Sequence, residues 1–376
     1  MSGENFNISA PGKRILVAPL EWGLGHATRC IPIIQELLAL NCDVLIGAEA
    51  AAHALLEKEF PQLQFLPLKG YRMKYSRNAY WLPAKILLQF PKIISSIYNE
   101  RRWLKKAIRN HSIDAVISDN RFGFYNSSVP CIYMTHQLTI KTGNRFTESI
   151  AQKIHYRFIN KYRECWVPDN EGPVNLAGVL SHPIRLPKIP LRYIGPLSRL
   201  EKKEVEKKYD LAVIISGPEP QRTLFEKLLL DQLSDYAGTV LFVRGLPGNS
   251  PGNISANSKI KIHDHLSSDE LNEAIQRSSM IISRSGYTTV MDLVKLQKPA
   301  ILIPTPGQPE QEYLADYLMG ENIFYCVAQK DLLLKQALQN AAGFSFRSPL
   351  TDMDNYREQL NVFVNSINKK QGSMRV

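Results

Sequence analysis

Short apolar runs alternate with helical patterns along most of the chain, and this alternation restricts the fold more than any other feature. In the first half the alternating runs are, in order, residues 14–19, 31–40, 44–46, 50–59, 115–118 and 131–135. Strands that alternate with helices in this way are typical of a parallel sheet covered by helices on both faces. We therefore predict an α/β fold that begins with a doubly wound, Rossmann-like domain.

A second alternating series follows a stretch rich in proline and then in charge, which begins after Trp166 and marks a crossing between lobes. Its runs are residues 211–215, 223–230, 240–243, 268–275, 280–282 and 300–303. A chain of 376 residues is longer than a domain with one hydrophobic core usually is. We therefore predict two doubly wound domains, 1–196 and 197–350, and a C-terminal helix and tail at 351–376. Ligands of such sheets bind outside the carboxyl ends of the strands, so the two lobes are expected to face a cleft.

The composition is that of a soluble globular protein, with 44% hydrophobic and 22% charged residues. The first thirteen residues are polar, and nowhere does an uncharged apolar run reach about 18 residues. The five cysteines are odd in number and lack the spacing of a disulfide framework or a zinc site. These features predict a cytoplasmic protein, neither secreted nor membrane-spanning, and they imply no metal and no other cofactor.

Almost the entire net charge of +11 comes from residues 69–109, which carry eleven basic residues against one acid, Glu100. Large apolar side chains are interleaved with these cations, and such a mixture suits a peripheral position on an anionic membrane surface. The alternative is a basic helix pair whose apolar face is simply core. We expect no nucleic-acid partner, because no recognised binding motif accompanies the charge.

The segment 283–313 restricts the possible functions of the chain more than any other segment does. An apolar strand runs into Ser283-Arg284-Ser285-Gly286, and a helical pattern begins directly after this turn. The unpaired backbone N–H groups of a helix N-terminus suit a phosphate. The next predicted strand ends in a loop whose polar side chains can hydrogen-bond sugar hydroxyls, namely Gln308, Glu310, Gln311 and Glu312. Two adjacent strand ends thus predict the phosphate and sugar contacts of a nucleotide-sugar site.

The loop after the first strand carries Gly23, Gly25 and His26 at the start of a helix. The glycines permit close approach of the backbone, as an acceptor or phosphate loop requires. A helix N-terminus lowers the pKa of a nearby histidine and favours the neutral form, which can take a proton from a hydroxyl. His26 is therefore a candidate general base, and the alternative is a histidine that caps or packs the helix start.

Two further residues fall at the predicted rim of the cleft: Asp119 after the strand 115–118, and His136 after the strand 131–135. Asp119 is a candidate to orient or assist His26, and the alternative is a cap of the following helix. His136 is a candidate for the acceptor or phosphate loop, and the alternative is a satisfied loop residue.

The chain carries three motifs in order: Gly-Leu-Gly-His-Ala-Thr-Arg at 23–29, Ser-Arg-Ser-Gly-x-x-Thr-Val-x-Asp at 283–292, and the Gln-rich loop that follows. Together they resemble family 28 and related glycosyltransferases of the GT-B fold. That group includes the enzyme that adds N-acetylglucosamine to the lipid-linked peptidoglycan precursor, and the diacylglycerol galactosyltransferases. The first motif also resembles poorly characterised relatives with Gly-x-Gly-His-x-x-Arg. The resemblance implies an acceptor-side first domain and a second domain that binds the nucleotide-sugar donor.

By this resemblance, Ser285 and Gly286 contact the donor diphosphate, and Asp292 contacts the ribose hydroxyls of uridine. The family has Glu at the position of Asp292, so the carboxylate here is one methylene shorter. The family often has a Gln-Gln pair where this chain has Gln311 and Glu312, which leaves the transferred hexose open. Arg199 is a candidate to bind the diphosphate, and the alternative is a charged residue of the linker. The remaining donor positions are Ser216 and Gly217 after the strand 211–215, His265 and Leu266 near the base, and Tyr287, Thr288 and Gln308.

The predicted reaction is inverting transfer of a hexose from a UDP-sugar to an acceptor hydroxyl of a lipid-linked or cell-envelope molecule, with His26 as the base. Two alternatives stay open, because a fold does not fix a function. One is a nucleotide-sugar epimerase or hydrolase, and the other is a non-catalytic nucleotide-sugar binding protein. No motif identifies the sugar, the acceptor or the oligomeric state.

Overall fold

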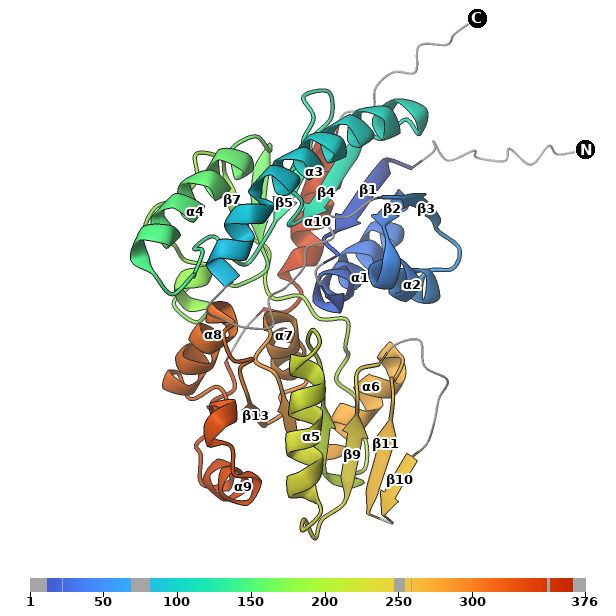
Figure 1. The fold of residues 1–376 in the computed structure, drawn as a ribbon. Coiled ribbons are helices and arrows are strands. Elements are labelled where there is room, and N and C mark those ends of the chain that lie inside the picture. The colour runs from blue at the N-terminus through green and yellow to red at the C-terminus, as the bar shows by residue number, and fades with distance from the viewer. Residues whose placement is uncertain are drawn as a thin grey trace, which may run out of the picture.

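The computed structural model describes residues 12–21, 23–68, 82–246, 254–257, 259–349 and 352–367. Two sheets lie one above the other, and each forms the centre of a separate lobe (Figure 1). Residues 69–81, where the predicted basic segment begins, lie outside the described residues.

The sheet of the first lobe has seven strands in the described part of the chain, in the order β3-β2-β1-β4-β5-β6-β7. All neighbouring strands in it are parallel. The bounds are β1 Arg14–Pro19, β2 Asp43–Ala48, β3 Gln64–Pro67, β4 Ala115–Asp119, β5 Cys131–Met134, β6 Glu164–Val167 and β7 Leu191–Tyr193.

Helices cover both faces of this sheet because alternate side chains of a strand point to opposite faces. Ile15 and Val17 of β1 belong to the core cluster that contains residues of α1, α2 and α10. Leu16 and Ala18 belong to a second cluster on the other face, which contains residues of α3 and α4. The bounds are α1 Leu24–Ala39, α2 Ala50–Glu59, α3 Leu82–Asn110, α4 Arg145–Ile159 and α10 Asn355–Ser366.

The sheet of the second lobe has the order β10-β11-β9-β8-β12-β13-β14, and only the pair β10–β11 is antiparallel among its described strands. Its strands are β8 Tyr209–Ile214, β9 Val240–Val243, β10 Ile254–Asn257, β11 Ile260–His263, β12 Ser278–Ser283, β13 Ala300–Leu302 and β14 Tyr325–Cys326. Its helices are α5 Gln221–Leu233, α6 Ser268–Gln276, α7 Tyr287–Lys295, α8 Pro309–Gly320 and α9 Leu334–Ala342. The prediction of two doubly wound parallel sheets is confirmed.

One hydrophobic cluster is continuous through both lobes. It contains Ile33 of α1, Val290 of α7 and Leu360 of α10, all at most 1% exposed. Figure 1 shows α1 directly above α7 at the junction of the lobes. The two lobes therefore share apolar packing as well as polar contacts.

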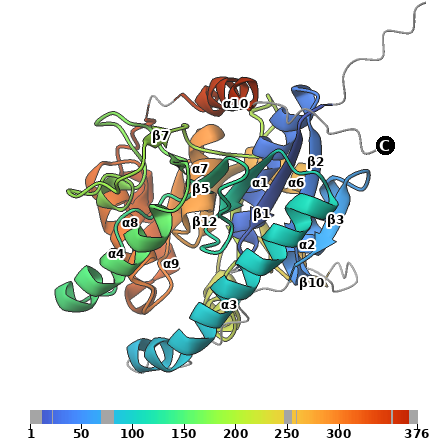
Figure 2. The same cartoon turned by 90° about the horizontal axis from the view of Figure 1, so that it is seen from above.

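The chain crosses between the lobes twice. After β7 it passes to β8, and after α9 it returns to the first lobe as α10, the red helix in Figures 1 and 2. Phe363 of α10 packs edge-on against Trp166 of β6, with ring centroids 5.2 Å apart. The two crossings touch at Gly195, where φ is +78° and an added Cβ would lie 2.7 Å from the carbonyl oxygen of Asp352.

The segment after Trp166, which the sequence predicts as a crossing between the lobes, also contains regular secondary structure. It contains a short 3-10 helix, Gly178–Leu180, and the strand β7, which pairs with β6 in the first sheet. Three residues with Arg192 in their centre do not form an apolar run, which explains why the strand was not predicted.

Candidate functional site

The loop after β1 turns at Gly23, which directly precedes α1 and has a φ of +81°. Glycine adopts this left-handed conformation without strain, so it allows α1 to begin immediately after the strand. A Cβ built on Gly23 would meet no atom within 4 Å, so the turn borders open space. His26 follows in the first turn of α1, with 16% of its side chain exposed.

His26 is paired with Asp119, the last residue of β4. Nδ1 of His26 lies 2.9 Å from Oδ2 of Asp119, whose side chain is fully buried. The pairing follows from the sheet, because β1 and β4 are neighbours and Asp119 is in register with Pro19 at the end of β1. Within the described ranges no protein group hydrogen-bonds to Nε2 of His26, so this nitrogen is accessible to a ligand.

Arg29 completes the pair from the next turn of α1 and is 2% exposed. Its Nε donates to Oδ2 of Asp119 at 2.9 Å, and Nη2 donates to Oδ1 of the same carboxylate. Nη2 also lies 2.8 Å from Nδ1 of His26, and this nitrogen either donates to Asp119 or accepts from Nη2, depending on the tautomer, but cannot do both. Asp119 is therefore held by a bidentate, charge-assisted contact of the kind that arginine favours.

These contacts shift the pKa values of both partners. Burial, reinforced by the positive charge of Arg29, lowers the pKa of His26, although Asp119 opposes this effect. For Asp119, burial would raise the pKa, but Arg29 and His26 outweigh it and hold the pKa below its ordinary value. The pair therefore consists of a neutral imidazole and an ionised carboxylate near pH 7.

The second lobe reaches this pair through Glu310, in the first turn of α8. Oε1 of Glu310 lies 2.7 Å from Nε2 of His136, and Nδ1 of His136 lies 3.0 Å from Nη1 of Arg29. Because an arginine can only donate, Nδ1 of His136 accepts and its Nε2–H donates to Glu310. A continuous chain of hydrogen bonds thus joins Asp119 in the first lobe to Glu310 in the second.

The N-terminus of α7 lies beside the His26 loop. The Oγ1 of Thr288 donates to the carbonyl oxygen of Gly25 at 3.2 Å. Gly286 is the N-cap of α7, and a Cβ built on it would meet no atom within 4 Å. The free N–H groups of this first helical turn therefore border open space, as an anion site requires.

Tyr287 and Ser285, both predicted as donor contacts, have side chains that make other bonds. The ring of Tyr287 stacks on His136 with centroids 4.3 Å apart, and its hydroxyl donates to the carbonyl oxygen of Pro168 at 2.8 Å. The hydroxyl of Ser285 donates to the carbonyl oxygen of Gln311 at 2.9 Å. Because their side chains make other bonds, these two residues can bind a phosphate through their main-chain N–H groups.

The predicted sugar loop between β13 and α8 is held by its own side chains. Oε1 of Gln311 accepts from the N–H of Thr305 at 2.9 Å, and Oε1 of Glu312 accepts from the N–H of Gly307 at 2.9 Å. Gln308 is the half-buried N-cap residue of α8. In this structure Gln311 and Glu312 stabilise the loop, whereas Glu310 points to the His136 side of the site.

Asp292 lies in the second turn of α7 and accepts a hydrogen bond from the hydroxyl of Ser198 at 2.6 Å. Burial raises the pKa of Asp292 to about 6, although Arg199 and Ser198 favour its ionised form. In the part of the chain that the structure describes, Nε of Arg199 is buried without a hydrogen-bond partner. The structure therefore brings Arg199 close to the predicted ribose carboxylate.

The remaining predicted donor residues lie farther from the centre. Ser216 and Gly217 are exposed just beyond β8, and Leu266 is buried in the cluster shared by the lobes. His265 is exposed, and partial burial followed by the charges of Lys58 and Arg199 lowers its pKa. Among the described residues, no hydrogen bond joins these four residues to His26 or its partners.

Two members of the site were not predicted in these roles. Arg29 was noted only as part of a motif, and Glu310 only as one of several polar groups of the sugar loop. A signal for Arg29 was present, because residues three positions apart on a helix lie on the same face. No comparable signal exists for Glu310, whose partner His136 is 174 positions away in the sequence.

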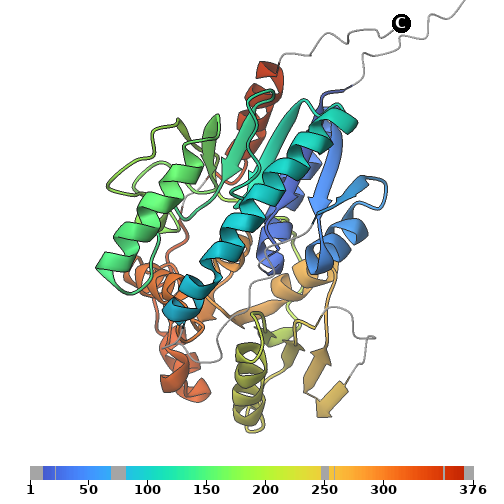
Figure 3. The ribbon, with the colours of Figure 1, turned by 45° about the horizontal axis from the view of Figure 1, so that its top comes forward.

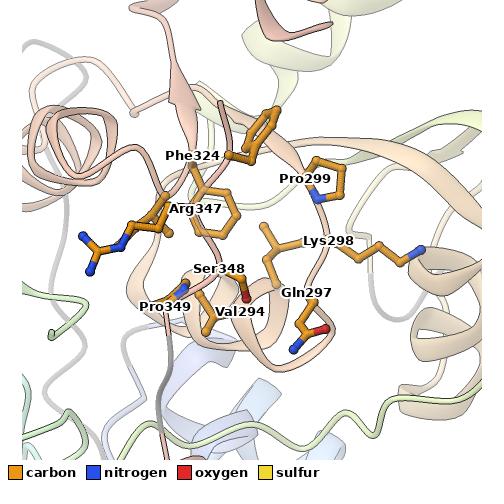
Figure 4. Close-up of a pocket in the computed structure, with 11 residues that line it drawn as sticks. Val294, Gln297, Lys298, Pro299, Phe324, Arg347, Ser348 and Pro349 are labelled. Carbon is orange, nitrogen blue, oxygen red and sulfur yellow. The ribbon is translucent and has the colours of Figure 1, made fainter. Parts of the chain in front are cut away.

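A separate cavity of about 330 Å³ lies in the second lobe (Figure 4). Apolar residues such as Val294 and Phe324 line it, and the charged ends of Lys298 and Arg347 point away from its centre in Figure 4. Lys298 and Phe324 precede β13 and β14, so the cavity lies at the amino ends of these strands. Gly286 follows the carboxyl end of β12, at the opposite edge of the same parallel sheet. The cavity is therefore not part of the site around His26.

One known family matches the C-terminal part of the chain. The sequence model of the glycosyltransferase family 28 C-terminal domain matches residues 249–368. The match covers the turn at Gly286, Asp292, the loop of Glu310 and the returning helix α10.

Curated relatives extend the similarity over most of the chain. An uncharacterized glycosyltransferase of Methanosarcina mazei is 23% identical over 77% of this chain and 79% of its own length. The UDP-N-acetylglucosamine--N-acetylmuramyl-(pentapeptide) pyrophosphoryl-undecaprenol N-acetylglucosamine transferase of Haemophilus ducreyi is 25% identical over 84% of this chain and 85% of its own length.

Solved structures show the same two-lobed fold. The glycotransferase of kitacinnamycin superposes with a TM-score of 0.62 at 12% identity, covering 95% of this chain and 96% of that one. MurG of Acinetobacter baumannii superposes with a TM-score of 0.53 at 13% identity, covering 95% of this chain and 100% of that one. At such identities the likeness concerns the fold alone, and it confirms the predicted GT-B architecture.

Proposed function

Because the chain is a glycosyltransferase of the GT-B fold that resembles family 28, we propose that it transfers a hexose from a UDP-sugar to an acceptor hydroxyl with inversion. The observation that carries this proposal is the His26–Asp119 pair, 2.9 Å apart, at a loop that touches the start of α7. A proton acceptor and an anion-binding helix N-terminus are the two groups that such a transfer needs.

In the proposed reaction His26 is the general base. When Nδ1–H donates to Asp119, the lone pair of Nε2 is free to accept the proton of the acceptor hydroxyl. The acceptor oxygen forms a bond to the anomeric carbon as the bond from that carbon to the diphosphate oxygen breaks. One attack from the side opposite the leaving group inverts the anomeric centre.

The leaving UDP gains negative charge as this bond breaks. The free N–H groups at the start of α7 are suited to stabilise that charge, and we propose that they do so without a metal. Asp292 is proposed to accept the ribose hydroxyls, with Arg199 beside it. The names of several relatives state a UDP-N-acetylglucosamine donor, which supports a UDP-sugar here.

We further propose a lipid-linked acceptor and peripheral binding at the inner face of the cell membrane. The relative from Haemophilus ducreyi has an undecaprenol-linked acceptor in its name. The described part of α3 exposes Arg101, Arg102, Lys105 and Lys106, and Figure 3 shows α3 and α4 on the same side of the first lobe. No described helix is both long and apolar enough to span a bilayer.

Some apolar residues near α3 support the alternative that they are core, and others support contact with a membrane. Ile97, Leu104 and Ile108 are buried, as the core alternative predicts. Tyr98 is 61% exposed, and Phe146 of the neighbouring α4 is 74% exposed. The exposed ring of Tyr98, with the guanidinium carbon of Arg102 5.8 Å from its centroid, supports contact with an anionic lipid surface.

The proposal is tested first with a thermal-shift panel of UDP-, GDP- and TDP-sugars, and then by transfer from the stabilising donor to a membrane-lipid extract. His26→Ala should abolish transfer and leave UDP affinity nearly unchanged, whereas the control His111→Ala should keep both. A fully active His26→Ala protein excludes His26 as the base. Release of free sugar or of an epimer without any acceptor would instead support the hydrolase or epimerase alternative.

A further inference from the structure

Asp119 acting alone would raise the pKa of His26 and so increase the fraction of the ring that is already protonated. A buried carboxylate 2.9 Å from an imidazole favours the protonated ring, because an opposite charge at this distance raises a histidine pKa. A histidine that already carries its second proton cannot take another from an acceptor hydroxyl. Burial of the ring opposes this effect of Asp119, and a cation beside the ring would oppose it further.

Arg29 has the geometry of such a group. It donates to both oxygens of Asp119, one of them Oδ2, which also faces His26. Its Nη2 lies 2.8 Å from Nδ1 of His26, so the guanidinium charge directly opposes a charge on the ring. At 2% exposure, little water is present to screen these effects.

We propose that Arg29 is a positioning residue that keeps His26 neutral, and hence able to act as a base, by neutralising Asp119 and disfavouring an imidazolium. The proposal rests on the role of His26 proposed above. It also gives the Arg of the Gly-x-Gly-His-x-x-Arg motif a chemical reason: the helix needs a cation one turn after the base.

The other groups around His26 reinforce the need for this cation. Burial raises the pKa values of Cys30 on α1 and Tyr287 on α7, so both stay neutral. For Glu310 on α8, burial would raise the pKa, but His136, Arg29 and His26 lower it, so Glu310 is ionised. Among the described residues, the remaining charged or titratable neighbours of His26 are Asp119 on β4 and His136 after β5, so loss of Arg29 would remove the permanent cation beside the ring.

The second lobe holds Arg29 in place. Nη1 of Arg29 donates to His136, which in turn donates to Glu310 of α8 and stacks on Tyr287 of α7. With Nε and Nη2 on Asp119 and Nη1 on His136, the guanidinium is fixed by two residues of the first lobe, and the second lobe supports it through its contacts with His136.

The test is an NMR titration of His26 in the full chain, with labelled histidine and the signal assigned by its absence in His26→Gln. In Arg29→Met the pKa of His26 should rise by about 1 to 3 pH units. Arg29→Lys keeps a cation and should shift it less. Arg157→Met, which removes an exposed arginine of α4, should leave it at the wild-type value.

Since Arg29→Met leaves the buried Asp119 carboxylate without its cation, the double variant Arg29→Met/Asp119→Asn is titrated as well. Loss of both charges should bring the pKa of His26 back toward the wild-type value. An unchanged pKa in Arg29→Met, or equal shifts in Arg29→Met and Arg29→Lys, would overturn the proposal. So would a double variant that keeps the full shift of Arg29→Met.

This titration needs no substrate, so its outcome is separate from that of the proposed function. If transfer is also observed, the acid limb of its pH profile should move to higher pH in Arg29→Met by the same amount as the His26 pKa. A raised His26 pKa without any transfer activity in the wild type would support the role of Arg29 and refute the glycosyl transfer.

Discussion

Given the proposed contact of Asp292 with the ribose of the donor, its raised pKa predicts that donor binding weakens as the pH falls toward 5. The carboxylate is held at a pKa of about 6 by burial, and only its ionised form is a good acceptor for two ribose hydroxyls. With this pKa, roughly nine-tenths of the carboxylate is ionised at pH 7 and roughly one-tenth at pH 5. Since apparent affinity scales with the competent fraction, the Kd of UDP-glucose should rise about tenfold from pH 7 to pH 5.

The assay is isothermal titration calorimetry with UDP-glucose, whose diphosphate has no terminal phosphate group that titrates near pH 6. Titrations at pH 6 in buffers of different ionisation enthalpy should show proton release, because binding favours the ionised carboxylate. Asp292→Asn should bind more weakly at pH 7 but with a Kd that no longer depends on pH. His265→Gln is a control for the other titratable side chain near Arg199. A Kd that stays constant from pH 7 to pH 5, or an unchanged pH slope in Asp292→Asn, would refute the reasoning.

Four further predictions concern stability, the lobe contact and the membrane. Because the folded pKa of Asp292 lies above its unfolded value, this group costs stability as the pH rises from about 4 to 6. Asp292→Asn should therefore stabilise the free protein by about 3 kcal/mol at pH 7 and hardly at pH 4, which urea unfolding at both pH values measures. Gly25→Ala should lower transfer activity severalfold, and adding Thr288→Ala should restore part of it, because a Cβ at position 25 would lie 3.0 Å from Oγ1 of Thr288. Glu310→Gln keeps an oxygen for His136 but removes the charge, so kcat/KM should fall about tenfold while UDP affinity stays the same; an equal loss of UDP affinity would place Glu310 in donor binding instead. Replacing Arg101, Arg102, Lys105 and Lys106 by Gln should release the protein from anionic liposomes in a flotation assay, and undiminished binding would rule out electrostatic docking through α3.

The architecture was predictable because its strands are short, continuous apolar runs. The predicted strand 240–243 and helix 50–59 coincide with β9 and α2. Several of the strands that were missed lack such a pattern. β10 and β11 contain Ser, Asn and Lys, and β6 begins with Glu164, whose carboxylate is satisfied by Trp166 and Arg192 only in the folded chain.

For the site, the sequence allowed us to predict only which loops lie together, because this follows from the topology of the sheet. Parallel strands end at one edge of the sheet, so His26, Asp119 and His136 were expected near one another. The directions of their side chains were not encoded locally. Gln311 and Glu312 were expected to face a sugar, yet their oxygens accept hydrogen bonds from the backbone of their own loop. Such competition between a ligand and a nearby N–H group depends on backbone geometry that a sequence pattern does not specify.

The contact between the two crossings at Gly195 has a mechanical consequence. The two chain segments touch at Gly195, and close by Asn355 donates to the carbonyl oxygen of Tyr193 at 3.1 Å. They would therefore act as a single pivot instead of two separate tethers. Rotation about that pivot changes distances in proportion to how far a group lies from it, while Gly195 itself hardly moves. The contacts between Thr288 and Gly25 and between Glu310 and His136 would then open and close together.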